Sequence, residues 1–255
     1  MIIKISKAFK IHKAKLILFV FALALVFFVY KNYTGGITRF ITVMATGVEP
    51  IYKIDTKSKE VYLTFNINDA DPKYVGKVIK ILDIENIRGV FFACGQWVER
   101  HEQTVNEIVK KHDLGNMGYS FDTMNKKTEE YLIDEIKKTE KLFKSRFSLD
   151  INMFRPPFGQ YDRRLVEAAD LLGYKIILAE IEINNGKYKS PEKVIKHVLK
   201  NIEKGAIISF DCNSVVVVES LPKIIKQIKN RGFEFIPLSA KISGKDSFSI
   251  NGFMI

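Results

Sequence analysis

Short apolar segments and amphipathic segments alternate through most of this chain, and this alternation limits the possible folds more than any other feature. The segments Val61–Phe65 and Gly89–Ala93 have the length and apolar character of buried strands. Pro72–Glu85, between them, has apolar residues at helical spacing and Asp71 as its N-cap. Such alternation predicts parallel strands covered by helices. Ligand sites in these folds lie at the carboxyl ends of the strands, so chemically active residues are expected there.

The alternation continues as far as Ile236. The later strand-like segments are His112–Asn116, Ile151–Phe154, Lys175–Ala179, Gly205–Phe210 and Phe233–Ile236, and the later helices are Trp97–Lys111, Thr128–Phe143, Asp162–Leu172, Pro191–Ile202 and Leu221–Lys229. Thr128 and Ser190 are suitable N-cap residues for two of these helices.

Residues 16–30 form an uncharged apolar run between Lys15 and Lys31. A helix of this length covers roughly 22 Å, less than the ~30 Å hydrocarbon core of a bilayer. Snorkelling lysines, or extension to Ala14 and Tyr33, make up the difference. Five lysines precede the run, which predicts a transmembrane anchor over residues 16–33 with a cytoplasmic leader, 1–15, and an extracytoplasmic domain. The alternative is a cleaved secretory signal ending near Ala45, which also exports the domain.

The remaining organisation follows from composition. Residues 34–58 are expected to form a polar stalk, residues 59–240 the folded domain, and residues 241–255 a loose tail. The net charge of +11 indicates solvated lysine-rich faces or attraction to an anionic cell wall or lipid headgroups, and the chain has no basic patch with interleaved aromatic residues that would indicate nucleic acid. Cys94 and Cys212 each follow a predicted strand, and we expect two unpaired core residues rather than a disulfide.

A stiff corner, Phe154–Gly159, places an arginine directly before two prolines. Proline fixes φ and lacks a backbone donor, so two in succession form an extended segment that holds Arg155 in one place. Alone, this pattern also occurs in surface turns. Together with its neighbours it sets the register of a recognisable fold.

The chain from Val61 to Leu238 resembles the polysaccharide deacetylase family, also called the NodB-homology or carbohydrate esterase 4 family. The resemblance rests on the ordered segments Leu63–Phe65, Gly89–Phe92, Trp97–His101, His112–Asn116, Phe154–Gly159, Leu172–Tyr174 and Gly205–Ile208. The segments near Asn66 and Cys94 are most similar to the sporulation-associated branch. Membership implies a distorted (β/α) barrel with fewer than eight strands.

Members of this family remove acetyl groups from N-acetylated glycans with a divalent metal such as zinc, held by one Asp and two His. The metal polarises the amide and activates water, an Asp acts as base, and a His protonates the leaving amine. An arginine beside the base orients it. The resemblance places this arginine on Arg155.

The other positions carry residues that lack the required chemistry. The resemblance places the base on Asn66, the metal ligands on Ile67, Met117 and Phe121, and the acid on Phe210, with Asp211 after it. An amide is no carboxylate base, and isoleucine and phenylalanine have no donor atom for a metal. Methionine is a soft ligand unsuited to a hydrolytic metal. We therefore expect no metal cofactor and no metal-dependent catalysis.

Several side chains are candidates for a binding groove. They are Arg155, Glu182, Asp211, Trp97 and Tyr119. Glu182 begins the segment that matches the family's Asp-x-x-Asp-Trp motif, and either Glu182 or Asp211 is expected to pair with Arg155 in place of the lost base. Carboxylates in neighbouring loops, Asp69, Asp71 and Asp122, leave open a rebuilt metal site. Trp97 is more typical of core than of a sugar-stacking surface. The histidines are expected to have structural roles.

Three functions remain open. The first, which we favour, is a non-catalytic deacetylase homologue, anchored in the cell membrane, that binds a cell-wall or spore-cortex glycan or an envelope protein. The second is a working hydrolase of non-peptide carbon–nitrogen bonds with a relocated site. The third is a structural envelope protein in which Phe121 and Phe210 fill the groove.

Overall fold

The computed structural model describes residues 49–184 and 186–242. The expected leader, the anchor over residues 16–33, most of the stalk and the tail beyond residue 242 lie outside these ranges. Among the helices described, none has the length and apolar character needed to cross a membrane.

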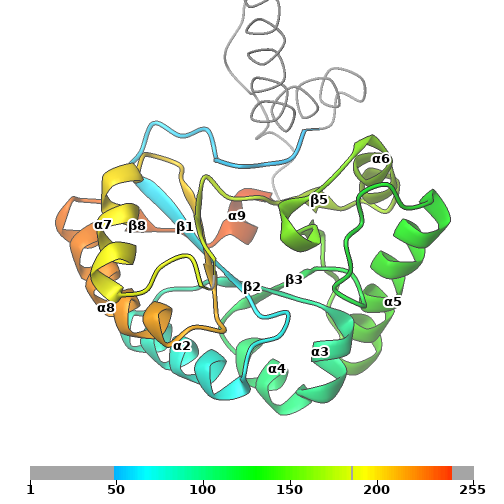
Figure 1. Ribbon diagram of the computed structural model, residues 1–255, viewed down its shortest axis with the longest axis horizontal. Helices are drawn as coiled ribbons and strands as arrows, with labels where there is room; N and C mark the ends of the chain where they lie inside the picture. Colours follow the sequence, from blue (N-terminus) through cyan, green and yellow to red (C-terminus); the bar gives the residue numbers. More distant parts are fainter. Residues whose placement is uncertain (1–48, 185, 243–255) are drawn as a thin grey trace, which may run out of the picture. The chain divides into compact units, whose positions relative to one another are not determined.

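A curled parallel sheet forms the centre of the described part of the chain (Figure 1). Its order is β5-β4-β3-β2-β1-β7-β6, with β8 paired to β1 beside this path. The strands are β1 (Glu60–Asn66), β2 (Val90–Ala93), β3 (Asp113–Asn116), β4 (Met153–Phe154), β5 (Lys175–Ile176), β6 (Ile181–Ile183), β7 (Ile207–Asp211) and β8 (Glu234–Phe235). The expected distorted barrel is therefore present as a half-barrel, but the described part of the chain has eight strands rather than fewer than eight, because the short strand β6 adds to the seven predicted.

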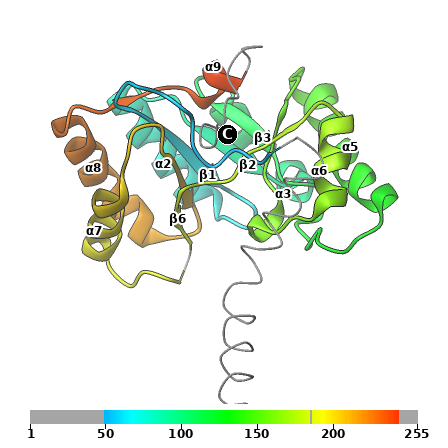
Figure 2. The same cartoon turned by 90° about the horizontal axis from the view of Figure 1, so that it is seen from above.

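Helices cover the outer side of this sheet. They are α2 (Pro72–Glu85), α3 (Gly95–Arg100), α4 (Glu102–Ile108), α5 (Glu129–Phe147), α6 (Arg163–Leu171), α7 (Pro191–Asn201), α8 (Val215–Asn230) and α9 (Leu238–Ile242). Figure 2 shows α7 and α8 on one side of the strands and α5 and α6 on the other. The bounds of α2 match those predicted from its apolar spacing, and Asp71 caps it by accepting from the backbone N–H of Lys73. Thr128 caps α5 in the same way, whereas Ser190 occupies the N-cap position of α7 without such a bond.

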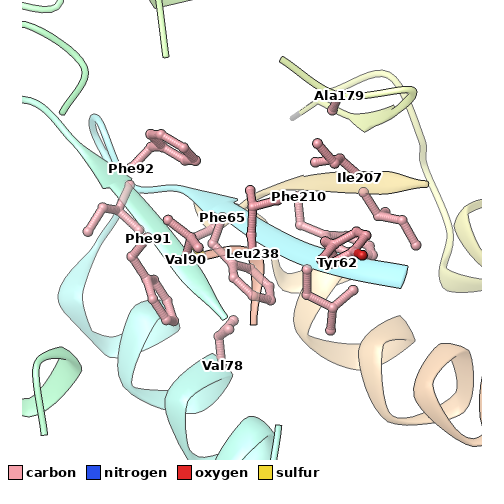
Figure 3. Close-up of a cluster of buried hydrophobic side chains, with 14 of the residues drawn as sticks. Tyr62, Phe65, Val78, Val90, Phe91, Phe92, Ala179, Ile207, Phe210 and Leu238 are labelled. Carbon is pink, nitrogen blue, oxygen red and sulfur yellow. The ribbon is translucent and has the colours of Figure 1, made fainter. Parts of the chain in front are cut away.

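Aromatic rings on the helix-facing side tie the three central strands together. Phe91, Phe65 and Phe210 are register partners on β2, β1 and β7, and their rings stack with centroids 5.0 and 5.8 Å apart. All three are fully buried. In Figure 3 Phe91 points toward Val78 of α2, whereas its neighbour Phe92 lies on the opposite face of the strand. The sheet thus has a packed outer face and a separate inner face.

Four elements differ from the sequence prediction. The helix expected over Trp97–Lys111 is two helices, because His101 has the non-helical dihedrals φ −134° and ψ 43°. The short strand β6 and the helix α9 were not predicted. Helix α8 begins at Val215, six residues before the expected start, and contains Pro222 in its interior. A proline usually marks the first turn of a helix, which explains the late start expected at Leu221.

Residues 49–58, expected in the stalk, pack onto the half-barrel. Ile51 and Ile54 are buried, and Ile51 and Lys53 form β-bridges to Ile177 and Ala206. Cys94 and Cys212 are buried and unpaired, as expected.

His112 has a structural position, as expected. Its ring is buried against Phe91, and its Nδ1 accepts a hydrogen bond from the backbone N–H of Gly89. Burial lowers the pKa of His112, opposed by the charges of Asp83 and Asp113 and assisted by those of Lys111 and Arg88. The fold therefore favours the neutral ring.

This preference predicts a loss of stability in mild acid. The folded state has the lower pKa, so it binds fewer protons than the unfolded state once the pH falls below about 6.5. Between pH 7 and pH 5 the free energy of unfolding should fall more steeply for the native chain than for His112→Gln. The two slopes should differ by up to about 1.4 kcal/mol per pH unit, the value for one proton. Urea unfolding at several pH values measures this. His197→Gln, on the outer helix α7, is the comparison: burial also lowers the pKa of this half-buried ring, so its change of slope should have the same sign but be smaller. A change as large as that of His112→Gln would contradict the assignment.

Candidate pocket at the strand ends

A pocket of about 290 Å³ opens at the carboxyl ends of the strands, where the fold class places ligand sites. Its polar lining includes Asn66, Arg155, Glu182, Ser209 and Asp211, and its apolar lining includes Met117, Phe121, Phe158 and Leu178. The sequence-predicted residues Arg155, Glu182 and Asp211 are therefore brought together.

Strand register explains the polar side of the pocket. On β1 and β7, Thr64 is paired with Ser209 and Asn66 with Asp211, while Glu182 of β6 is paired with Ser209. Because side chains alternate along a strand and paired residues share a face, these five side chains form one polar stripe on the inner face.

Arg155 lies beneath this stripe and is almost completely buried, with 4% of its surface exposed. Its Nε donates to the carbonyl of Ile177, and its Nη2 donates to Leu178 O and Thr64 Oγ1. Its Nη1 donates to Asn66 Oδ1 and Ser209 Oγ, at 2.9 and 3.0 Å. A guanidinium has five N–H donors, so every donor is used.

The expected pairing of Arg155 with Glu182 is not a direct ion pair among the described residues, although the charge of Glu182 acts on the guanidinium. Among the described residues all five hydrogen-bond partners of Arg155 are neutral, and its guanidinium also lies 4.1 Å from the centre of the Phe92 ring. Burial lowers the pKa of Arg155 to about 9, and the charge of Glu182 acts in the opposite direction. The guanidinium remains charged at neutral pH.

Phe210 does not face the pocket, contrary to our prediction that it occupies the acid position of the groove. Its ring is fully buried and stacks on Phe65 on the helix-facing side. A residue that exchanges protons with a ligand must face the pocket, and on β7 the pocket-lining residues are Ser209 and Asp211. At the end of β7 the carboxyl group of Asp211 therefore faces the pocket where Phe210 was expected.

The remaining degenerate positions carry no suitable metal donors. Met117 and Phe121 line the pocket, whereas Ile67 is fully buried and Asn66 is engaged with Arg155 and Ser209. A thioether and two hydrocarbon side chains do not fit a zinc ion. In the described part of the chain no three His, Cys, Asp or Glu residues are arranged to hold a metal. Asp69, Asp71 and Asp122 thus form no rebuilt metal cluster.

Two groove candidates lie away from the pocket. Trp97 is 1% exposed, and its Nε1 donates to the carbonyl of Ala70, so it is a core residue. Tyr119 does not line the pocket, and its hydroxyl donates to Glu99.

Sequence reasoning missed two features of the pocket rim, the left-handed backbone at two phenylalanines and the contact between their rings. Phe121 and Phe158 both have positive φ, 55° and 59°, and their ring centroids are 4.9 Å apart. Phe158 is 63% exposed. Buried Glu135 fixes the loop that carries Phe121, because its Oε2 accepts from the backbone N–H groups of Tyr119 and Ser120 and from the Ser120 hydroxyl. Left-handed backbone at an aromatic residue is unusual and has no single-residue sequence signal.

The half-barrel, its Arg-Pro-Pro corner and its strand-end pocket define a polysaccharide-deacetylase-type domain. The sequence model for polysaccharide deacetylase matches residues 53–177. The chain belongs to the polysaccharide deacetylase family.

Two curated relatives come from Bacillus subtilis. The uncharacterized protein YlxY is 26% identical over 186 residues, which cover 72% of this chain and 58% of that protein, so the chain spans less than two thirds of it. The peptidoglycan-N-acetylmuramic acid deacetylase PdaA is 27% identical over 194 residues, or 73% of each protein.

Among solved structures, a carbohydrate esterase 4 family pseudoenzyme from Bacillus anthracis has a TM-score of 0.72 at 23% identity, covering 76% of this chain and 69% of that one. At this identity the likeness shows the fold. A mutant of the same pseudoenzyme, described as having restored enzymatic activity, has the same TM-score.

Because every N–H donor of Arg155 has a partner, a carboxylate at position 66 is expected to change the stability of the chain. Asn66→Asp should stabilise the chain by about 1 kcal/mol, because a bond between two charged groups replaces a bond to a neutral amide. Asn66→Ala should destabilise it by ~1–3 kcal/mol, since a buried guanidinium donor loses its acceptor. Urea unfolding measures both. Asn68→Asp adds the same charge to the pocket lining and is the control; a destabilised Asn66→Asp variant would contradict the prediction.

Removing a buried and an exposed aromatic ring near the pocket is expected to reduce the stability of the chain by different amounts. Phe210→Ala removes a buried ring and should cost ~3–5 kcal/mol of stability. Phe158→Ala removes a mostly exposed ring and should change stability by less than about 1 kcal/mol. Denaturant unfolding of the two variants compares them directly. Equal losses would show that Phe210 is not a core residue.

Proposed function

We propose that this chain is a non-catalytic member of the polysaccharide deacetylase family that binds a peptidoglycan-type glycan in the strand-end pocket. The observation that carries the proposal is a strand-end pocket with a polar and an aromatic side, beside which the positions that the resemblance gives to the base and the metal ligands hold Asn66, Ile67, Met117 and Phe121. The pocket is kept while its catalytic groups are replaced.

The chemistry of the pocket supports the absence of turnover. General base catalysis contributes ~10²–10⁴-fold to rate, and the amide of Asn66 supplies no base. Met117 and Phe121 offer no suitable ligand for a metal that would activate water. We accordingly propose that the chain has no resident metal cofactor.

The relatives support both parts of the proposal, glycan binding and the absence of catalysis. PdaA acts on peptidoglycan, which supports a glycan ligand. The Bacillus anthracis structure is of a pseudoenzyme with the same fold, which supports loss of catalysis within this architecture. A mutant of that protein has restored enzymatic activity, so in that protein the loss of catalysis can be reversed by mutation.

The cellular setting belongs to the same proposal. A single-pass anchor over residues 16–33, with a cytoplasmic N-terminus, would hold the domain outside the cell membrane, where cell-wall or spore-cortex glycan, or an envelope protein, is accessible. The apolar run and its preceding lysines support this location.

The test combines turnover and binding with the purified full-length chain. Acetate release from peptidoglycan and chito-oligosaccharides should stay at background with added Zn²⁺, Co²⁺ or Mn²⁺, while the chain should bind the same glycans in a sedimentation assay. Asn184→Trp, which fills the pocket mouth, should weaken binding at least tenfold. Asn230→Trp, on the exposed end of α8, is the matched control and should bind normally.

Two outcomes would overturn the proposal. Metal-dependent acetate release that EDTA abolishes would establish a working hydrolase with a relocated site. Absence of both turnover and glycan binding would favour a structural envelope protein.

A further inference from the structure

The charged groups of the pocket differ in whether they are free to form hydrogen bonds with a ligand. Among the described residues that line it, Arg155 is the one cation, and its five donors are occupied by protein acceptors. Glu182 is exposed at the pocket and forms no ion pair among the described residues. Asp211 adds a second carboxylate, whose Oδ1 accepts from the backbone N–H of Asn213. The charges that face the opening are therefore acceptors.

The aromatic rim adds a second attraction for a cation. The exposed ring of Phe158 and the adjoining ring of Phe121 lie at the same pocket as the two carboxylates. The negative faces of aromatic rings attract cations, and they also pack against the C–H faces of sugars. Both rings are held in left-handed backbone conformations, and such strain persists where the surrounding structure supports it. Here Glu135 braces one loop and the two prolines brace the other.

We propose that the pocket recognises the cationic amine of a de-N-acetylated hexosamine in preference to the acetamide of the N-acetylated sugar. This inference rests on the proposed glycan-binding function. An ammonium group offers three donors and no acceptor, which suits carboxylates. An acetamide carbonyl requires a donor, and Arg155 has none left. The amides of Asn68 and Asn184 in the lining can donate, but they are uncharged and so favour neither form as strongly as the carboxylates favour an ammonium group. The ligand is thus the amine form of the glycan, generated by a deacetylation reaction carried out elsewhere.

The net charge of the chain cannot be the source of this preference for the amine form, so the preference must come from the pocket itself. With a net charge of +11, the chain as a whole repels a cationic oligosaccharide. Tight binding of the amine form therefore requires a local negative site. Electrostatic attraction between the ammonium group and Glu182 or Asp211 would weaken as salt increases.

The experiment compares N-acetylated and fully de-N-acetylated chito-oligosaccharides of equal length by isothermal titration calorimetry at pH 6, with the full-length chain. The amine form should bind at least tenfold more tightly, and this advantage should shrink in high salt. Glu182→Gln and Asp211→Asn should each reduce the advantage several-fold. Glu219→Gln, an exposed carboxylate on α8 remote from the pocket lining, is the matched control. Thermal unfolding of each variant verifies that it is folded.

The preference for the amine form and glycan binding itself can fail separately in this experiment. Equal binding of both forms, or preference for the acetylated form, would overturn the inference and leave glycan binding intact. An advantage for the amine that persists in the Glu182→Gln and Asp211→Asn variants would also overturn it. Failure of both forms to bind would remove the proposed function together with the inference.

Discussion

The guanidinium of Arg155 connects segments of the half-barrel that are far apart in sequence. It binds Thr64 and Asn66 at the end of β1, the carbonyls of Ile177 and Leu178 after β5, and Ser209 on β7. Burying a charge without a counter-charge is costly, so its stability depends on all five donors being satisfied. The prolines after it limit the backbone conformations of the corner, which reduces the entropy lost in fixing this geometry.

Neutral acceptors around Arg155 explain how the fold accommodates an amide, Asn66, at the position where the family resemblance puts the base. In the family the arginine orients a carboxylate, and removal of one partner of a buried pair usually leaves an uncompensated charge. Here Asn66 keeps an oxygen at hydrogen-bonding distance from Nη1, and Ser209 supplies another. The substitution preserves the geometry of the scaffold while removing the group that accepts a proton. At this position the scaffold contact and the base differ by a single side-chain atom, because an amide nitrogen replaces a carboxylate oxygen.

Sequence reasoning succeeded where the pattern is periodic and failed where it is not. The bounds of α2 follow from its apolar spacing, its capping Asp71 and its first-turn proline. The strand Ile207–Asp211 begins with a continuous apolar run, so the sequence alone does not show which residues face the helices. Phe210 was consequently assigned to the wrong face. The Phe121–Phe158 contact depends on two left-handed residues in separate loops, and no local pattern predicts it.

The correction at β7 changes the chemical character of the site. With Phe210 facing the pocket, the cluster of Met117, Phe121 and Phe210 would form an apolar plug. With Asp211 there instead, the same opening has an aromatic side and a carboxylate side, above an arginine that has no free donor. Met117 and Phe121 are unsuitable ligands for a metal ion, whose positive charge the two carboxylates would otherwise balance. Among the described lining residues the two carboxylates outnumber the one buried cation, Arg155, and the ligand that fits the site best supplies a second positive charge.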